Sequence, residues 1–238
     1  MPEIKVIYSD EDLIVVNKPA GISVHGGLTV QGSTMVDFLL EKFPEIKSVG
    51  DEPELRPGIV HRLDKNTSGV MIVARNQKTF LALKELFQKR LVEKKYLAIC
   101  CGEFKEKLGI INMPIGRIIA NPLKRGVNPP TGGGKSRIRG EREAVTEFRV
   151  IKTGEALSLV ELKPQTGRMH QLRVHLAALH HPVACDTVYG GKNVCCPMGA
   201  GRQLLHASSI SFSYPEGRKL IFEAEAPPDF AIAEESIL

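Results

Sequence analysis

The 238-residue sequence contains no apolar run that approaches the roughly 20 residues a membrane-spanning helix requires. Its amino terminus, residues 1–5, lacks the basic region and apolar stretch of a secretory signal. No segment repeats at a period of about 20–50 residues, which excludes a solenoid or a propeller. These absences predict a cytoplasmic protein with no membrane partner.

Cysteine is scarce and occurs in an odd number. Four of the five cysteines form two adjacent pairs, Cys100-Cys101 and Cys195-Cys196, which makes a poor disulfide framework. We therefore expect reduced thiols, Cys185 included, that pack as small apolar side chains. The alternative is a zinc site with four candidate ligands, His180, His181, Cys185 and Cys195. Because adjacent cysteines lack the usual C-x-x-C spacing, we expect no metal.

Charge and composition are those of a soluble globular chain. Hydrophobic residues make up 42% of the sequence and charged residues 25%, close to the average for such proteins. Lys and Arg number 32 against 27 Asp and Glu, a net charge of +5. This mild excess is compatible with an anionic partner.

Short β-branched runs and two helical periodicities predict an α+β fold. The expected strands cover residues 12–18, 58–61, 69–74, 96–101, 144–151, 157–163, 207–214 and 219–224. The first helix, residues 77–90, has apolar residues at helical spacing and Asn76 as its cap. The second helix, residues 168–179, has an apolar stripe that starts at Met169.

One segment, residues 117–142, is basic and rich in glycine and proline. Its seven basic residues are Arg117, Lys124, Arg125, Lys135, Arg137, Arg139 and Arg142, against one acid, Glu141. The composition predicts a mobile loop. Charge of one sign favours a cationic flap for phosphates, and the alternative is a solvated surface loop.

Two polar clusters carry the candidate chemistry. The first, HRLDKNTSG at residues 61–69, lies between two expected strands, and a turn closed by Asp and Thr side chains is its simplest interpretation. The second, PQTGRMHQLRVH at residues 164–175, places Arg168, Gln171 and His175 on one flank of the second helix. A polar helix start can bind an anion, although solvated helix ends are common.

Together these clusters resemble the RluA family of RNA pseudouridine synthases. The segment HRLD-x-x-TSG at residues 61–69 is similar to the family's long, ordered signature. NKPAGISVH at residues 17–25, KYLA at 95–98 and LKPQTGR at 162–168 resemble its other motifs. DTVYG at residues 186–190 and LHA at 205–207 also occur in family order. The resemblance covers about residues 5–230.

The resemblance implies a single catalytic domain over residues 1–238, with a mixed, mostly antiparallel sheet and with helices and RNA-binding loops around a central cleft. It implies that specific uridines in ribosomal or transfer RNA are isomerised to pseudouridine, with no cofactor. Asp64 is then the catalytic carboxylate, as nucleophile or base. Arg168 pairs with it and favours its charged form. Tyr96, the third catalytic residue, stacks on the uracil and helps to remove the C5 proton.

The resemblance also implies substrate-binding residues. Because the target base must leave the folded RNA, Arg62 is expected to fill the gap that the flipped nucleotide leaves. The other substrate-binding candidates are His61, Lys18, His25, Gln171, Arg173 and His175. A structural role is an equally good interpretation for Lys18, His25, Arg173 and His175.

The sequence departs from the family pattern at Cys185, where glycine is usual before Asp186. It also starts directly at the catalytic domain, so we expect no amino-terminal S4 domain. We expect a monomer because the sequence has no heptad pattern and no obvious apolar face. Two alternatives stay open. One is a non-catalytic RNA-binding or ribosome-assembly protein on the same fold. The other is a metal-dependent nuclease, which the shortage of carboxylates around Asp64 disfavours.

Overall fold

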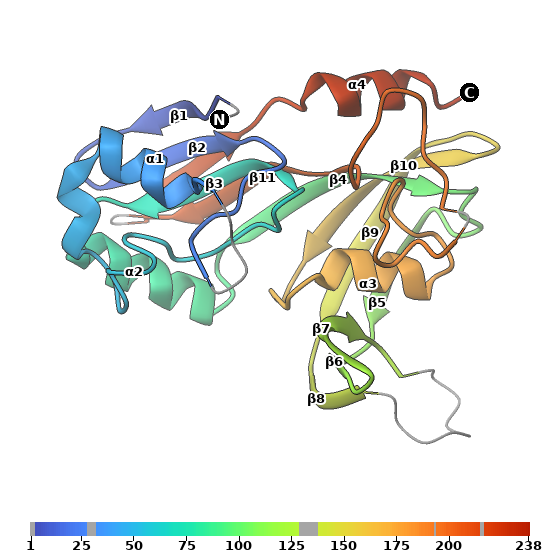
Figure 1. The fold of residues 1–238 in the computed structure, drawn as a ribbon, viewed down its shortest axis with the longest axis horizontal. Coiled ribbons are helices and arrows are strands. Elements are labelled where there is room, and N and C mark those ends of the chain that lie inside the picture. The colour runs from blue at the N-terminus through green and yellow to red at the C-terminus, as the bar shows by residue number, and fades with distance from the viewer. Residues whose placement is uncertain (1–2, 28–31, 129–137, 193, 215–216) are drawn as a thin grey trace. The chain divides into compact units, whose positions relative to one another are not determined.

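The computed structural model describes residues 3–27, 32–128, 138–192, 194–214 and 217–238 (Figure 1). The chain divides into two compact units, each described here by itself. Unit 1 comprises Met1–Lys94 and His206–Pro227, and unit 2 comprises Lys95–Leu205 and Pro228–Leu238. No helix within the described ranges is long and apolar enough to cross a membrane. The single catalytic domain over residues 1–238 stays a prediction.

Unit 1 is built on strands in the order β1-β2-β3-β11, with β12 paired to β11. Its elements are β1 (Lys5–Ser9), β2 (Leu13–Lys18), α1 (Met35–Lys42), a 3-10 helix (Pro44–Ser48), β3 (Ser68–Ala74), α2 (Gln77–Gln88), β11 (Leu205–Ser213) and β12 (Lys219–Glu223). The pairings are antiparallel except that of β3 with β11, which is parallel. All seven residues of β3 are buried, so this strand forms the centre of the unit.

Unit 2 contains a larger and a smaller antiparallel sheet. The larger has the order β4-β10-β9-β5 and the smaller the order β7-β6-β8. The elements are β4 (Glu93–Cys101), β5 (Leu108–Asn112), β6 (Ile115–Ile118), β7 (Asn121–Gly126), β8 (Ile138–Arg142), β9 (Val145–Thr153), β10 (Leu157–Pro164), α3 (Gln171–Ala178) and α4 (Pro228–Glu235). Leu172 and Leu176 of α3 join the apolar core on the larger sheet.

These elements confirm the predicted α+β class with a mostly antiparallel sheet. The first helix is confirmed as α2, because the side chain of Asn76 accepts the N–H of Thr79 at 2.9 Å and caps it. The expected strand at residues 58–61 is a single β-bridge from Ile59 to Val73. The second helix begins three residues later than predicted, at Gln171, because His170 takes a left-handed conformation with φ 59°.

The basic segment differs from the expected irregular loop. Its described parts form β6, β7 and β8, hereafter the basic sheet, drawn in green and yellow-green in Figure 1. A Cβ atom at Gly116 would lie 2.8 Å from the carbonyl oxygen of Arg139, so glycine here permits close strand pairing. Lys135 and Arg137 lie outside the described residues, and the mobility of the segment stays a prediction.

The prediction of reduced thiols is wrong for four of the five cysteines. Disulfides join Cys101 to Cys195 and Cys185 to Cys196, and Cys100 is a buried free thiol. A β-bridge between Cys100 and Val183 brings the end of β4 beside the segment that carries Cys185. The pairing therefore depends on contacts between distant segments, which the spacing of the cysteines does not reveal.

Candidate active site

Asp64 lies in unit 1, half-buried, on the loop that leads into β3. The N–H of Thr67 donates to the carbonyl oxygen of Asp64 at 3.0 Å and closes a turn. The expected turn is thus present, but this hydrogen bond joins backbone groups, and its closure by the Asp and Thr side chains stays a prediction. The position of this turn depends on the contacts that hold the loop at its two ends.

His61 anchors the first end of this loop. Its Nε2 accepts the N–H of Ile72 in β3 at 3.0 Å, and its ring stacks on Phe87 of α2 with 4.9 Å between the ring centroids. Burial and, as a smaller cause, the nearby charge of Lys94 together lower the pKa of His61 to about 3. The imidazole is therefore neutral at physiological pH, and its contacts give it a structural role.

Ser68 and Gly69 anchor the second end. Ser68 Oγ lies 3.0 Å from Nδ1 of the buried His206, whose Nε2 donates to the carbonyl oxygen of Ala224 at 2.9 Å. A Cβ atom at Gly69 would lie 2.2 Å from the carbonyl oxygen of Ala207, and φ is +121°. Only glycine fits such an approach at this backbone conformation.

Lys18 holds the middle of the loop. Its ammonium group is fully buried and donates to the carbonyl oxygens of Pro19, Ile22 and Lys65 at 2.8, 3.0 and 3.1 Å. The N–H of Gly21 donates to the same Lys65 oxygen at 2.9 Å. The residue next to Asp64 is thus bound to the NKPAG segment, and Lys18 acts on the backbone rather than on a phosphate.

Arg62 and His25 meet on the surface of unit 1. Arg62 Nη1 lies 3.0 Å from Nε2 of His25, and Nδ1 of His25 lies 2.7 Å from the carbonyl oxygen of Gly26. Because a guanidinium only donates and a carbonyl only accepts, Nε2 accepts and Nδ1 donates. Arg62 is exposed, so its guanidinium can reach a ligand in solution.

Unit 2 contributes Tyr96 and Arg168. Tyr96 is half-buried in β4 opposite Leu162 of β10, and it packs on the apolar core. Arg168 is half-buried on the turn before α3, where its Nε donates to the carbonyl oxygen of Glu143 at 3.0 Å. Because Asp64 belongs to unit 1, the pairing of Arg168 with Asp64 stays a prediction.

Gln171 holds the Arg168 turn in place. Its Oε1 accepts the backbone N–H of Arg168 at 3.0 Å and the hydroxyl of Thr166 at 2.8 Å. Its Nε2 donates to Val145 and Thr146 at 3.0 Å each. All its hydrogen-bonding positions are thus occupied by the protein, which makes Gln171 a support for Arg168 and not a substrate contact.

Arg173 and His175 are also buried supports. The guanidinium of Arg173 donates to the Asp186 carboxylate at 2.7 and 2.9 Å, with both side chains almost fully buried. His175 Nε2 donates to the carbonyl oxygen of Met113 at 3.0 Å, and its Nδ1 lies 3.0 Å from the Thr146 hydroxyl. Burial lowers the pKa of His175. The expected phosphate contacts do not fit these buried, partnered positions.

The family described as RNA pseudouridylate synthase matches residues 12–178, which include the Asp64 loop, Tyr96 and Arg168. The ribosomal large subunit pseudouridine synthase D of Borreliella burgdorferi is 38% identical over 229 residues, covering 96% of this chain and 67% of the relative. The chain belongs to this family. It is an RNA pseudouridine synthase, and the RluA-family resemblance is confirmed.

Solved structures of pseudouridine synthases share the fold. The human RNA pseudouridylate synthase domain containing 1 has a TM-score of 0.75 at 26% identity, covering 96% of this chain and 86% of that chain. The human RNA pseudouridylate synthase domain containing 4 has a TM-score of 0.74 at 29% identity, covering 97% and 91%. The fold of this synthase is therefore that of the family.

Three residues that support the site were not identified from the sequence: His206, Asp186 and Glu143. His206 and Asp186 lie in motifs that were noticed only for their order, and Glu143 lies in no motif. Among the residues whose placement is described, no three His, Cys, Asp or Glu side chains converge as metal ligands. Two members of the alternative zinc set, Cys185 and Cys195, are instead in disulfides.

Proposed function

We propose that this synthase converts uridine to pseudouridine in large-subunit ribosomal RNA, with Asp64 as the carboxylate that starts the reaction. The observation that carries the proposal is the position of Asp64 within HRLD-x-x-TSG, on a loop held at both ends by His61 and by Ser68-Gly69. The choice of RNA is supported by relatives named ribosomal large subunit pseudouridine synthase D.

The reaction is an isomerisation. The bond between N1 of uracil and C1′ of ribose breaks, the base turns, and C5 bonds to C1′. The proton on C5 is released and N1 gains one, so no electron acceptor and no cofactor is required. Asp64 supplies an ionised oxygen, either as nucleophile or as base, to begin this sequence.

Three further side chains complete the proposed machinery. Arg168 stabilises the charged form of Asp64, because a guanidinium beside a carboxylate favours ionisation. Tyr96 stacks on the uracil. Arg62, which is exposed and hydrogen-bonded to His25, occupies the gap left when the base leaves the stack.

The basic sheet is the proposed site for RNA phosphates. Arg117, Arg139 and Arg142 are exposed on β6 and β8. Phosphate contacts hold the RNA without reading its bases. We also propose that the protein acts as a monomer, and its cytoplasmic location stays a prediction from the sequence.

The test is release of tritium from a large-subunit ribosomal RNA transcript labelled at C5 of uridine, with EDTA present. We expect release by the wild type and less than about 1% of it by Asp64→Asn, because the amide serves neither as nucleophile nor as base. Asp51→Asn, the same change at a surface ion pair with Lys84 in unit 1, is the control and should match the wild type.

Three results would contradict the proposal. Binding of the RNA without tritium release by the wild type would favour the non-catalytic protein. Cleavage of the RNA that EDTA abolishes would favour the nuclease. Undiminished release by Asp64→Asn would remove Asp64 from its assigned role.

A further inference from the structure

The hydroxyl group of Tyr189 lies between the basic sheet and the start of α3. Its oxygen accepts the backbone N–H of Arg125 in β7 at 3.1 Å and lies 2.7 Å from Nδ1 of His170. A hydroxyl group donates one hydrogen bond and accepts two, so it can serve both partners at once. It thereby connects a strand of the basic sheet to the residue two positions after Arg168.

The Tyr189 ring is held from several sides. The Asp186 carboxylate accepts the backbone N–H groups of Val188 and Tyr189 at 3.0 and 3.1 Å. The guanidinium of Arg173, bound to the same carboxylate, lies 5.0 Å from the Tyr189 ring centroid. Lys124 of β7 donates to the carbonyl oxygen of Val188 at 3.2 Å. The hydroxyl group therefore has one defined position.

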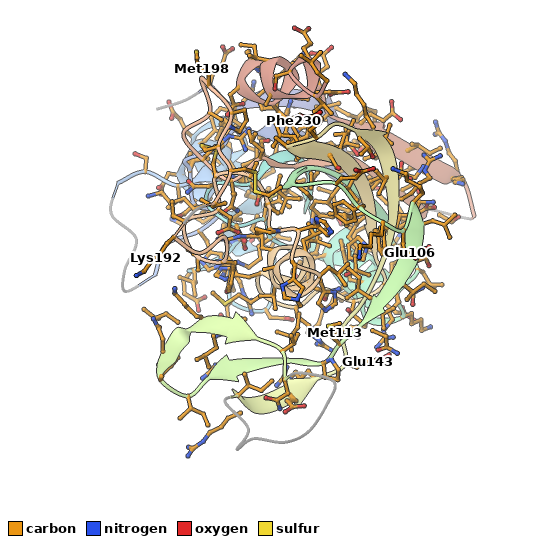
Figure 2. All side chains as sticks on the ribbon, turned by 90° about the vertical axis from the view of Figure 1, so that its right-hand side faces the viewer. Glu106, Met113, Glu143, Lys192, Met198 and Phe230 are labelled. Atoms are coloured by element: carbon orange, nitrogen blue, oxygen red, sulfur yellow. A yellow bond between two sulfur atoms is a disulfide. The ribbon has the colours of Figure 1, made fainter. Side chains whose placement is uncertain are left out.

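A second connection involves the side chain of Arg168 itself. Its Nε donates to the carbonyl oxygen of Glu143, the residue that follows β8. Figure 2 shows Glu143 and Met113 where the basic sheet joins the rest of unit 2. The Arg168 turn is thus linked to β7 through Tyr189 and to the end of β8 directly.

His170 needs such support, because its backbone is in a left-handed conformation with φ 59° and ψ 18°. For a residue other than glycine this conformation costs a free energy of order 1 kcal/mol, and it persists only when surrounding contacts stabilise it. His170 has no side-chain cap hydrogen bond at the start of α3. Its contact with Tyr189, in addition to the 5.6 Å edge-on contact of the two rings, holds the turn that carries Arg168.

We propose that Tyr189 is a positioning residue, which ties the basic sheet to the Arg168 turn so that RNA bound on the sheet meets an arginine at a fixed place. The proposal rests on the proposed function. It assigns to Tyr189 no contact with the reacting atoms. Removal of the hydroxyl group should therefore slow the chemical step and leave the affinity for RNA largely unchanged, since the charges of the sheet remain.

The test compares Tyr189→Phe with Tyr214→Phe in single-turnover tritium release from the same transcript. Tyr214 is a matched control, because it is also half-buried and its hydroxyl lies 3.1 Å from Thr79 Oγ1 in unit 1. For Tyr189→Phe we expect a rate at saturating enzyme about tenfold lower, with Kd for the transcript within about twofold of the wild type. Tyr214→Phe should keep the wild-type rate.

A double-variant cycle shows whether the effect passes through His170. His170→Gly removes the imidazole while tolerating the left-handed conformation. If both groups act through one hydrogen bond, the double variant should be about as slow as either single variant. Two independent tenfold losses would instead make the double variant about a hundredfold slower than the wild type. In the unliganded protein, the NMR signals of the His170 ring should shift in Tyr189→Phe and stay unchanged in Tyr214→Phe.

The remaining outcomes would overturn either the positioning role of Tyr189 or the proposed function. An unchanged rate in Tyr189→Phe, multiplicative losses in the cycle, or a loss confined to Kd would overturn the positioning role. Equal slowing by Tyr214→Phe would show a general effect on folding and would overturn it too. No tritium release by the wild type would instead refute the proposed function, on which the role depends.

Discussion

Replacement of Lys18 by methionine tests whether this lysine holds the Asp64 loop or binds RNA. Its side chain has 0% exposure, and its ammonium group donates to three backbone carbonyl oxygens between 2.8 and 3.1 Å away. Methionine has a similar length and volume, so it fills the space without the charge. The change therefore isolates the three hydrogen bonds from packing.

The size of the effect follows from the groups left behind. A hydrogen bond to a charged group contributes about 1.5–3 kcal/mol, and a buried carbonyl that loses its donor costs about 1–3 kcal/mol. The oxygen of Lys65 keeps the N–H of Gly21, whereas those of Pro19 and Ile22 lose the ammonium group. Relief of the buried charge offsets part of this loss, and we expect a net destabilisation of about 3–5 kcal/mol.

The assay is unfolding in denaturant, with Lys65→Met as the control because the Lys65 side chain is exposed. The control should lie within about 0.5 kcal/mol of the wild type. RNA affinity, measured where every variant is folded, should be the same for Lys18→Met and the wild type. Unchanged stability together with a salt dependence of RNA binding reduced by about one unit of slope would refute the reasoning and make Lys18 a phosphate contact.

Two further changes test the anchors of the loop. Gly69→Ala should prevent the parallel pairing of β3 with β11 and abolish the cooperative unfolding transition, because the added Cβ would lie 2.2 Å from the carbonyl oxygen of Ala207. The control Gly21→Ala, whose Cβ would have nothing within 4 Å, should fold. A normally folded Gly69→Ala protein would contradict the assignment. Because the pKa of His61 is about 3 in the folded protein, below its usual 6.5, the folded state becomes less stable as pH falls from 6.5 toward 3. His61→Phe should make the stability less dependent on pH in that window, as measured by thermal melting at several pH values. An unchanged pH dependence would show that another group titrates.

Local signals in the sequence predicted two of the helices, α2 and α3, and most strands of the large sheet, but neither α1 nor α4. The helix at α2 was predictable because its cap, Asn76, and its apolar spacing lie within one short segment. The β-branched runs predicted β2, β3, β4, β9, β10, β11 and β12, whereas β1 and β5 were not predicted. The start of α3 was not predictable, because it follows the left-handed conformation of His170, which no local signal in the sequence indicates. The hydrogen-bond partner of its ring, Tyr189, lies 19 residues further along the chain.

Composition failed where close packing decided the structure. The glycines and prolines in residues 117–142 indicate a loop by composition, yet described parts of the segment form strands, and Gly116, just before it, allows β6 to approach β8. In the site, the motifs predicted where Asp64 and Arg168 lie on their loops. They did not separate surface from interior, because burial of Lys18, Gln171, Arg173 and His175 depends on which carbonyls and carboxylates the fold brings to them.

The Cys101–Cys195 disulfide has a topological consequence for the synthase. It spans 94 residues of chain, so the basic sheet, Arg168 and Tyr189 all lie on one covalent ring. In the chain-entropy description, a ring of this size stabilises the folded state by about 4–5 kcal/mol through the unfolded chain. Unit 1 has no cysteine. Reduction should therefore remove a covalent constraint from unit 2, which carries the basic sheet, and none from within unit 1, which carries the Asp64 loop.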